Sequence, residues 1–189
     1  MVKFSPDPGP TPDAELIEAI SRGSVQAFEE LYARHRDWVV RLAYRFTGNS
    51  HDALDVLQDT FAYLLKKAPR LELYAKLTTY LYPVVKNLSM TILRKRGRML
   101  GSDAILEHVA APVWTPGEGA ASSRAELAAV LAALPEAQRE VLLMRFVDGL
   151  SLEEISDALA IPVGTVKSRV HNALAALRAD PRTREYFGA

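Results

Sequence analysis

Four polar side chains between positions 167 and 172 have the chemistry and the spacing of a nucleic-acid contact. A cation, a hydroxyl, an imidazole and an amide recur at positions i, i+1, i+4 and i+5, which share one face of a helix: Lys167, Ser168, His171 and Asn172. Groups of these kinds bind phosphates and base edges in the major groove of DNA. Arg169 falls one position off this face and is expected to contact a phosphate. Thr165, near the helix start, could cap the helix and contact a phosphate as well.

The surrounding run from Ser151 to Arg178 predicts two helices joined by a tight turn. The second helix would bury apolar side chains that recur at helical spacing, namely Val166, Val170, Leu174 and Leu177. The preceding helix, Leu152–Leu159, would turn its apolar residues inward and its acids outward. This is the helix-turn-helix plan of DNA-binding proteins. The alternative is an ordinary helical hairpin with a solvated polar face, because the same geometry occurs without DNA.

The charges of the chain cancel in total but are unevenly distributed. Its 189 residues carry 23 basic and 23 acidic side chains, which argues against a histone-like basic binder. From Lys66 to Arg98, nine bases stand against one acid, a net charge of +8. From Arg124 to Ala160, three bases stand against seven acids, a net charge of −4. The two segments could therefore face different partners.

Several classes of site and location are disfavoured by what the chain lacks. The absence of cysteine excludes disulfides, thiolate zinc sites and thiol nucleophiles. The scattered histidines suggest no metal-ligand spacing, and there is no glycine-rich phosphate loop, so we expect no metal, no cofactor and no catalytic residues. No secretory leader and no apolar run of the ~18 residues that a membrane span needs are visible. We therefore expect a soluble, cytoplasmic protein without a membrane span.

Apolar periodicity predicts an all-α protein made of two small helical domains joined by a flexible linker. The expected divisions are a disordered, proline-rich tail over residues 1–12, a first domain over 13–97, the linker over 98–123, a second domain over 124–180 and a C-terminal tail over 181–189. Within the first domain, a third helix would run from Asp52 to Lys67, with five large apolar residues on its core side: Leu54, Leu57, Phe61, Leu64 and Leu65. A fourth helix should start between Thr79 and Pro83, or be kinked there, because proline disrupts a helix interior.

Six short segments in order carry a family resemblance. They are FEELYARH, RLAYRFTGN, DALDVLQDTF, LPEAQREVLLMRF, LSLEEIS and PVGTVKSRV. Their sequence and spacing resemble the extracytoplasmic-function (group IV) sigma factors of bacterial RNA polymerase. The resemblance covers about Phe28 to Arg98, called region 2 in that family, and about Leu127 to Arg178, called region 4. It implies a protein that binds core RNA polymerase and promoter DNA and directs promoter-specific initiation through the −10 and −35 elements.

The resemblance also assigns surfaces to partners. Asp55, Gln58 and Asp59 lie on the outer face of the third helix and would bind the clamp helices of the β′ subunit, while the β flap is a further expected contact. Carboxylates can pair there with partner arginines, although a solvated helix face is the simpler interpretation. The helix that follows would contact the −10 region through Tyr80, Tyr82, Lys86, Asn87, Arg94 and Arg96. Cations would hold phosphates and aromatic surfaces would receive unstacked bases, with the Asn87 amide able to read a flipped base. Packing in the core is the alternative for each tyrosine.

The −35 element would be read by the face first described, from Thr165 to Asn172. Tyr80 stands where the family usually has tryptophan, and Ala160 where its turn usually has glycine. An alanine forced to positive φ there would cost roughly 1 kcal/mol. Asn172 and Ala173 replace basic residues at the end of the reading face, which predicts an atypical −35 preference and a weaker phosphate contact.

Three other functions compete with this interpretation. A regulator of the LuxR or response-regulator type would share the second domain, but its first half would show βα repeats, and no strand pattern is visible. An adaptor or anti-sigma protein that binds polymerase without DNA would not need the +8 segment. An enzyme would need a converging catalytic constellation. An anti-sigma partner for this chain is compatible with the family but is not specified by the sequence.

Overall fold

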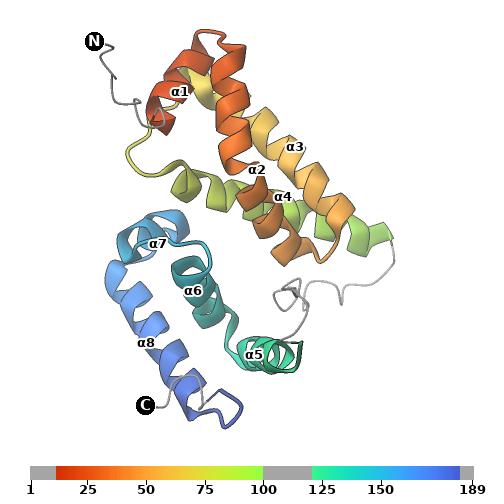
Figure 1. Ribbon diagram of the computed structural model, residues 1–189, viewed down its shortest axis with the longest axis vertical. Helices are drawn as coiled ribbons and strands as arrows, with labels where there is room; N and C mark the ends of the chain where they lie inside the picture. Colours follow the sequence, from red (N-terminus) through yellow and green to blue (C-terminus); the bar gives the residue numbers. More distant parts are fainter. Residues whose placement is uncertain (1–11, 100–120, 184–189) are drawn as a thin grey trace, which may run out of the picture.

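The computed structural model describes residues 12–99 and 121–183. Every regular element in these two stretches is a helix, which confirms the all-α prediction, and the helices form two groups, one from each stretch (Figure 1). Most of the expected N-terminal tail, linker and C-terminal tail falls on residues 1–11, 100–120 and 184–189, outside the described residues. Residues 12–99 are called the N-terminal domain below, and residues 121–183 the C-terminal domain.

The N-terminal domain is built around three long helices. In chain order its elements are α1 (Asp13–Ser21), α2 (Val25–Thr47), α3 (Ser50–Lys67), the short 3₁₀ helix η1 (Ala68–Arg70) and α4 (Leu77–Met99). Helices α2, α3 and α4 pack against one another, and α1 packs against α2 and η1 (Figure 1). The apolar faces of these helices form the core of the domain. Side chains there that are at most 1% exposed include Leu31, Val39, Leu42, Val56, Leu64 and Leu81.

Short polar signals set the ends of these helices. Ser24 caps α2 by accepting a hydrogen bond from the backbone N–H of Ala27 at 3.2 Å. Gly48 ends the same helix in the left-handed conformation, with φ at 63°, which glycine adopts without strain. Asn49 then caps α3, because its side-chain oxygen accepts from the N–H groups of His51 and Asp52. Residues 48–50 therefore combine a helix stop with the start of the next helix.

Of the two alternatives predicted for the fourth helix, a start between Thr79 and Pro83 was wrong. Helix α4 begins at Leu77, and Pro83 lies inside it rather than in its first turn. An interior proline removes one backbone hydrogen bond and costs roughly 3 kcal/mol. Leu77, Leu81 and Val85 are fully buried on either side of the proline. We infer that their burial outweighs this cost and keeps the first turns of α4 helical.

The predicted core side of the third helix was also wrong in part. Leu57, Phe61 and Leu64 are buried as expected, but Leu54 and Leu65 are 51% and 43% exposed. At 3.6 residues per turn, these two leucines lie roughly a quarter turn away from the centre of the buried stripe. The sequence pattern counted both as core because they are apolar and near the correct spacing.

The C-terminal domain contains α5 (Ala121–Ala133), α6 (Glu136–Phe146), α7 (Leu152–Leu159) and α8 (Val163–Ala179). Helix α8 packs against both α6 and α7. A small core joins α5, α6 and α8 through Val130, Leu134, Leu142, Ala173 and Leu177. Thr183, beyond α8, is fully buried and its hydroxyl donates a hydrogen bond to the carbonyl of Leu177.

The two domains share one continuous hydrophobic core. The cluster of buried residues that fills the N-terminal domain extends into the C-terminal domain through Val141, Met144, Leu150, Ile155 and Val166. Helix α7 packs directly against α4, as the neighbouring positions of these helices show (Figure 1). In the part of the chain that the structure describes, no helix combines the length and apolarity required to cross a bilayer.

Candidate nucleic-acid interface

Helices α7 and α8 form the predicted helix-turn-helix. The Ser151 hydroxyl accepts from the backbone N–H of Glu154, and the Glu154 carboxylate accepts from the N–H of Ser151, which is a complete capping box. Ala160 ends α7 with φ 53° and ψ 44°, the left-handed conformation anticipated for this position. It is the one residue other than glycine with positive φ in the described stretches. The Ser156 hydroxyl donates to the Ile161 carbonyl at 2.5 Å and ties α7 to the turn.

The predicted reading face of α8 is exposed as a unit. Lys167, Ser168, His171 and Asn172 all lie on the solvent side, whereas Val166, Ala173 and Leu177 are buried beneath them. The Ser168 hydroxyl donates to the Thr165 carbonyl at 3.0 Å. Thr165 and Arg169 are half-buried at the edges of this face. Burial of Ala173 corrects the expectation that this residue helps to form the end of the reading face; its small side chain instead fills the contact between helices.

The six residues predicted for the −10 region do not share one face of α4. Tyr80, Asn87 and Arg94 recur every seven residues and therefore point in similar directions, away from the centre of the buried stripe. Asn87 and Arg94 are exposed, and Tyr80 is half-buried. Burial, followed by the hydrogen bond and charge of Tyr63 on α3, raises the pKa of the Tyr80 phenol to about 12. Tyr80 is therefore a neutral aromatic group at physiological pH.

Tyr82 and Lys86 lie on the opposite side of α4, one turn apart, and both contact the C-terminal domain. Tyr82 is 1% exposed, and its ring packs edge-on against Phe46. The Tyr82 hydroxyl donates to Glu140 Oε1 on α6 at 3.0 Å, and Lys86 Nζ donates to the same oxygen at 2.6 Å. Burial, the Glu140 carboxylate and their hydrogen bond raise the pKa of Tyr82, so this phenol keeps its proton. In this arrangement the polar ends of both side chains are paired with Glu140.

Arg96 lies near the C-terminal end of α4 and is exposed together with Arg94. Its guanidinium donates to Asp52 Oδ2, in the first turn of α3, at 3.0 Å. The same end of α3 places His51, Asp52 and Asp55 with their ligand atoms within 4.8 Å of one another, a geometry that could hold a cation. Both carboxylates already have partners there, because Asp52 pairs with Arg96 and Asp55 Oδ2 lies 3.4 Å from His51 Nδ1. We therefore assign no metal to this cluster.

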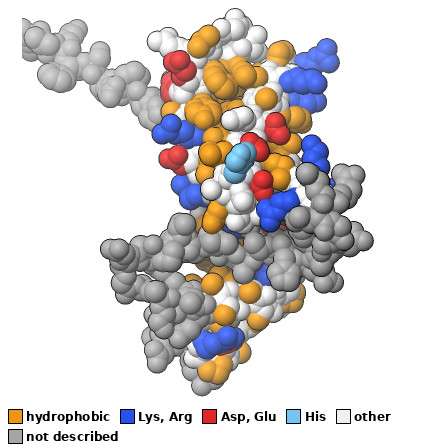
Figure 2. Space-filling model, turned by 90° about the vertical axis from the view of Figure 1, so that its right-hand side faces the viewer, with side chains coloured by type: hydrophobic (Ala, Val, Ile, Leu, Met, Phe, Trp, Pro, Cys, Tyr) orange, Lys and Arg blue, Asp and Glu red, His pale blue; other side chains and the backbone are white. Residues whose placement is uncertain are grey.

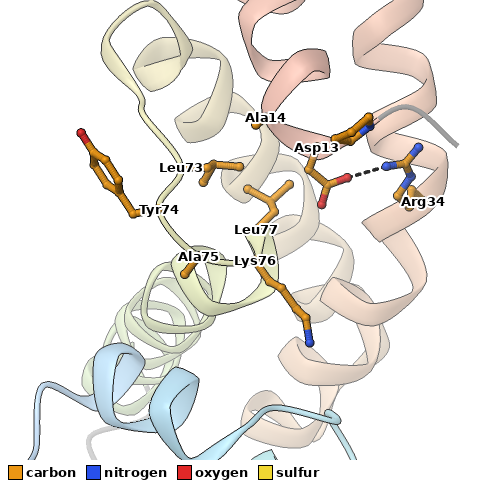
Figure 3. Close-up of a pocket in the computed structure, with 9 residues that line it drawn as sticks. Asp13, Ala14, Arg34, Leu73, Tyr74, Ala75, Lys76 and Leu77 are labelled. Atoms are coloured by element: carbon orange, nitrogen blue, oxygen red, sulfur yellow. Dashed lines mark hydrogen bonds and ion pairs between the residues drawn. The ribbon is translucent and has the colours of Figure 1, made fainter.

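The segment before α4 borders a hollow of about 490 Å³. It is lined by residues from α1, α2 and the connection from Leu73 to Leu77, as Figure 3 shows. The Arg34 guanidinium donates to Asp13 Oδ1 at 2.6 Å on one wall. Tyr74 is 90% exposed, with its ring directed away from the other labelled side chains (Figure 3). The lining of the hollow therefore combines apolar side chains with the Arg34–Asp13 pair, Lys76 and the exposed ring of Tyr74.

The outer face of α3 carries the residues predicted to bind a protein partner. Asp55, Gln58 and Asp59 are exposed, as are Leu54 and Leu65 beside them. Figure 2 looks onto the side on which α3 lies in Figure 1 and shows hydrophobic and acidic side chains next to one another. Such a mixed surface suits a protein partner that carries both arginines and apolar groups.

The contacts between the two domains were missed by the sequence analysis. Arg45 on α2 forms two hydrogen bonds with Asp148, at 2.6 and 3.3 Å, and both side chains are largely buried. Burial raises the pKa of Asp148, and the opposing attraction of Arg45 reduces this effect. Lys76 lies 3.3 Å from Glu154. The opposite net charges of residues 66–98 and 124–160 were the one indication of these contacts in the sequence. They did not show which residues pair with each other.

Comparison with known proteins matches both domains to one family. The family model of sigma-70 region 2 matches residues 31–99, and that of sigma-70 region 4 matches residues 124–177. The ECF RNA polymerase sigma factor SigW of Bacillus subtilis is 29% identical over 177 residues, which cover 88% of this chain and 95% of SigW. The ECF RNA polymerase sigma factor SigE of Mycolicibacterium smegmatis is 33% identical over 178 residues, which cover 92% of this chain and 68% of SigE.

Two solved structures share the fold. One is CnrH in complex with the cytosolic domain of CnrY, with a TM-score of 0.64, 24% identity, and coverage of 88% of this chain and 95% of that chain. The other is the sigma factor RpoE in complex with the anti-sigma factor NepR from Bartonella quintana, with a TM-score of 0.63, 23% identity, and coverage of 82% and 96%.

Proposed function

The chain belongs to the extracytoplasmic-function sigma factors of the sigma-70 family, and on this premise we propose which of its surfaces serves each partner. As a member of this family, it directs promoter-specific initiation of transcription by RNA polymerase. The N-terminal domain corresponds to region 2 and the C-terminal domain to region 4. The comparisons give no support to a regulator of the LuxR or response-regulator type.

Helix α8 is proposed to read the −35 element. The observation that carries this assignment is the joint exposure of Lys167, Ser168, His171 and Asn172 over a buried stripe. Because α8 is a recognition helix in a helix-turn-helix, this face can enter the major groove while Thr165 and Arg169 contact flanking phosphates. An amide at position 172 can pair with an adenine edge, whereas a cation would favour guanine or a phosphate. We therefore expect Asn172 to contribute to base preference.

The −10 region is proposed to bind along α4 and the segment before it. Asn87, Arg94 and Arg96 are exposed along the helix, and the hollow beside Tyr74 and Lys76 is large enough to receive an unstacked base. Tyr80 offers a neutral ring at the edge of the same face. Tyr82 and Lys86 would take part only in an arrangement of the domains that uncovers them.

Core RNA polymerase is proposed to bind two surfaces. The clamp helices of β′ would contact α3 through Asp55, Gln58 and Asp59, with Leu54 and Leu65 as apolar neighbours. The β flap would contact the C-terminal domain, where Phe146 and Val147 are 62% and 51% exposed. Phosphodiester bond formation belongs to the polymerase in this scheme, so the chain needs no catalytic residue of its own and would act in the cytoplasm. An anti-sigma partner that covers these surfaces stays an expectation.

Initiation on defined promoters tests these assignments. Purified chain is mixed with core polymerase and genomic fragments, and start sites are mapped. A promoter found in this way is then used with Lys167→Ala and Asn172→Ala, and with Arg178→Ala at the exposed end of α8 as the matched control. We expect Lys167→Ala to lower initiation on all promoters. Asn172→Ala should change base preference within the −35 element. If the chain starts transcripts no better than core alone, the initiation function is wrong; unchanged preference in Asn172→Ala would remove only that residue's assignment.

A further inference from the structure

Tyr63 is an aromatic residue of α3 that belongs neither to the buried core nor to the apolar edge proposed for polymerase. Its side chain is 36% exposed. Tyr63 follows Leu54 by nine residues, about two and a half turns of helix, so the two side chains point in opposite directions. Leu65 likewise lies on the Leu54 side of the helix. The exposed ring of Tyr63 therefore faces a different partner.

The edge of α3 that carries Tyr63 adjoins α4. The Tyr63 phenol shares a hydrogen bond with the phenol of Tyr80, near the start of α4. Farther along, the Arg96 guanidinium of α4 donates to Asp52 Oδ2 of α3 at 3.0 Å. These two contacts mark the line along which the packed helices α3 and α4 meet (Figure 1). Tyr63 thus lies beside the residues of α4 that are proposed to contact the −10 region.

Lys67 adds a cation to the ring of Tyr63. The Lys67 ammonium lies 5.6 Å from the centroid of this ring, within the range of a cation–π contact, and both side chains are exposed. Such a contact is weak in water, so a phosphate can draw the ammonium away and leave the ring face to a base. Aromatic rings next to cations are the combination with which proteins hold single-stranded nucleic acid.

We propose that Tyr63 is a further residue of the −10 contact: its ring stacks on an unpaired base next to Tyr80, and Lys67 holds the adjoining phosphate. This inference rests on the proposed function of α4. The hydrogen bond between the two phenols fixes both rings before DNA binds, which lowers the cost of ordering them. The Asp59 carboxylate, one turn before Tyr63, repels phosphate, so the backbone of the strand passes on the Lys67 side.

Photo-crosslinking of the wild-type chain in complex with core polymerase tests the stacking directly. The promoter mapped as described above supplies the −10 strand, and 5-iodouracil replaces one base at a time along it. Irradiation links this base to an aromatic side chain stacked on it, and mass spectrometry identifies the linked residue. We expect one position to crosslink to Tyr63 and a neighbouring position to crosslink to Tyr80. Absence of a Tyr63 crosslink at every position would overturn the proposal.

Variants at position 63 separate the ring from the hydroxyl. The affinity of the polymerase complex for the same single strand is measured with Tyr63→Ala, Tyr63→Phe and Tyr63→Trp. We expect Tyr63→Ala to weaken binding about tenfold, and the other two to stay within about twofold of the wild type because they keep a ring face. Circular dichroism checks that all variants fold. An equal loss in Tyr63→Phe and Tyr63→Ala would show that the ring does not carry the contact, and the proposal would be wrong.

The salt dependence of strand binding tests Lys67. Lys67→Ala is compared with Lys66→Ala, which removes the same charge from the neighbouring exposed position on α3. We expect the slope of log affinity against log salt concentration to decrease by about 0.7 in Lys67→Ala, the value for one phosphate contact on a single strand. The slope should be unchanged in Lys66→Ala. Equal slopes in the two variants would overturn the role of Lys67.

Two further measurements distinguish the proposal from its rivals. Competition with labelled wild-type chain gives the affinity of Tyr63→Ala for core polymerase, which we expect to be unchanged. A loss confined to core binding would place Tyr63 on the polymerase surface and overturn the proposal. Initiation by the wild type is measured in parallel. Failure of the Tyr63 contact with intact initiation overturns only this inference, whereas a wild type that initiates no better than core alone overturns the proposed function.

Discussion

Ala160 is a residue at which a backbone conformation anticipated from the sequence is found in the structure. Its left-handed conformation, with φ 53° and ψ 44°, lets α7 stop and α8 begin within three residues. The Cβ atom makes this conformation unfavourable by roughly 1 kcal/mol, a cost that glycine avoids. The turn was predicted from the helix-turn-helix pattern. Because this chain has alanine where the family usually has glycine, backbone strain was expected at this position.

The substitution Ala160→Gly should therefore stabilise the chain by about 1 kcal/mol. The matched control is Ala176→Gly at an exposed position inside α8, where glycine should destabilise by about 1 kcal/mol because it weakens a helix interior. Urea unfolding followed by circular dichroism measures both changes. A loss of stability in both variants would show that the left-handed conformation at position 160 carries no strain.

Tyr80 should ionise later than an ordinary tyrosine. Burial and the interaction with Tyr63 raise its pKa to about 12. Because the folded pKa lies above the unfolded value, the contribution of Tyr80 to stability is fully present below about pH 10 and is lost as pH rises through 12. Absorbance at the tyrosinate band is titrated in the wild type and in Tyr80→Phe, and the difference isolates this phenol. A difference curve with its midpoint near pH 10 would contradict the assignment.

At the scale of the element, α3 shows how a helix can be predicted correctly and still be assigned the wrong faces. Its bounds, Ser50–Lys67, differ from the predicted ones only at the start, where Asn49 supplies the cap. Leu54 and Leu65 were placed in the core, yet both are largely exposed. Apolar character alone does not distinguish a core residue from an exposed residue that binds another protein.

We expect Leu54→Asp to weaken binding to core RNA polymerase by roughly tenfold, because a carboxylate beside the contact would lose water without gaining a partner. Val25→Asp is the control. Val25 is 69% exposed on α2, and this substitution also replaces an exposed apolar side chain with a carboxylate. Competition with labelled wild-type chain for core polymerase gives the relative affinities. Equal affinity of the two variants would exclude Leu54 from the polymerase contact, and thermal unfolding checks that neither variant loses its fold.

Helix α4 illustrates the limit of local rules in another way. Pro83 predicted a later start, since proline is tolerated in a first turn and costly in an interior. The helix nevertheless begins at Leu77, where fully buried leucines fix the first turns. Packing with α2 and α3 is information that no local window of the sequence contains.

At the scale of the whole molecule, Arg45–Asp148 is the most deeply buried of the three ion pairs described between the domains. Both side chains are at most 12% exposed, and the guanidinium donates to both carboxylate oxygens. Burial raises the pKa of Asp148, so transfer of this charge out of water costs more than Arg45 returns. The pair therefore specifies how the domains fit together more than it stabilises them.

Asp148→Asn should separate the two domains, because it leaves the Arg45 guanidinium without its carboxylate in a largely buried place, at a cost of about 3–5 kcal/mol to their packing. Arg45→Met combined with Asp148→Leu should keep the domains packed, since apolar groups of similar size can replace a buried pair at little cost. Small-angle X-ray scattering of both variants compares their radii of gyration. An equally compact Asp148→Asn chain would show that this pair does not contribute to the packing of the domains.

The sequence by itself determined the helices, the helix-turn-helix and the reading face from Lys167 to Asn172, because these depend on periodicity and on capping between residues close in the chain. It also determined the family, through six ordered segments. Only the tertiary structure decided which face of α4 is open and which is covered. Tyr82 and Lys86 meet Glu140 more than fifty residues away in the sequence, and no helical period encodes such a contact. Shape and charge complementarity between two folded surfaces bring them together.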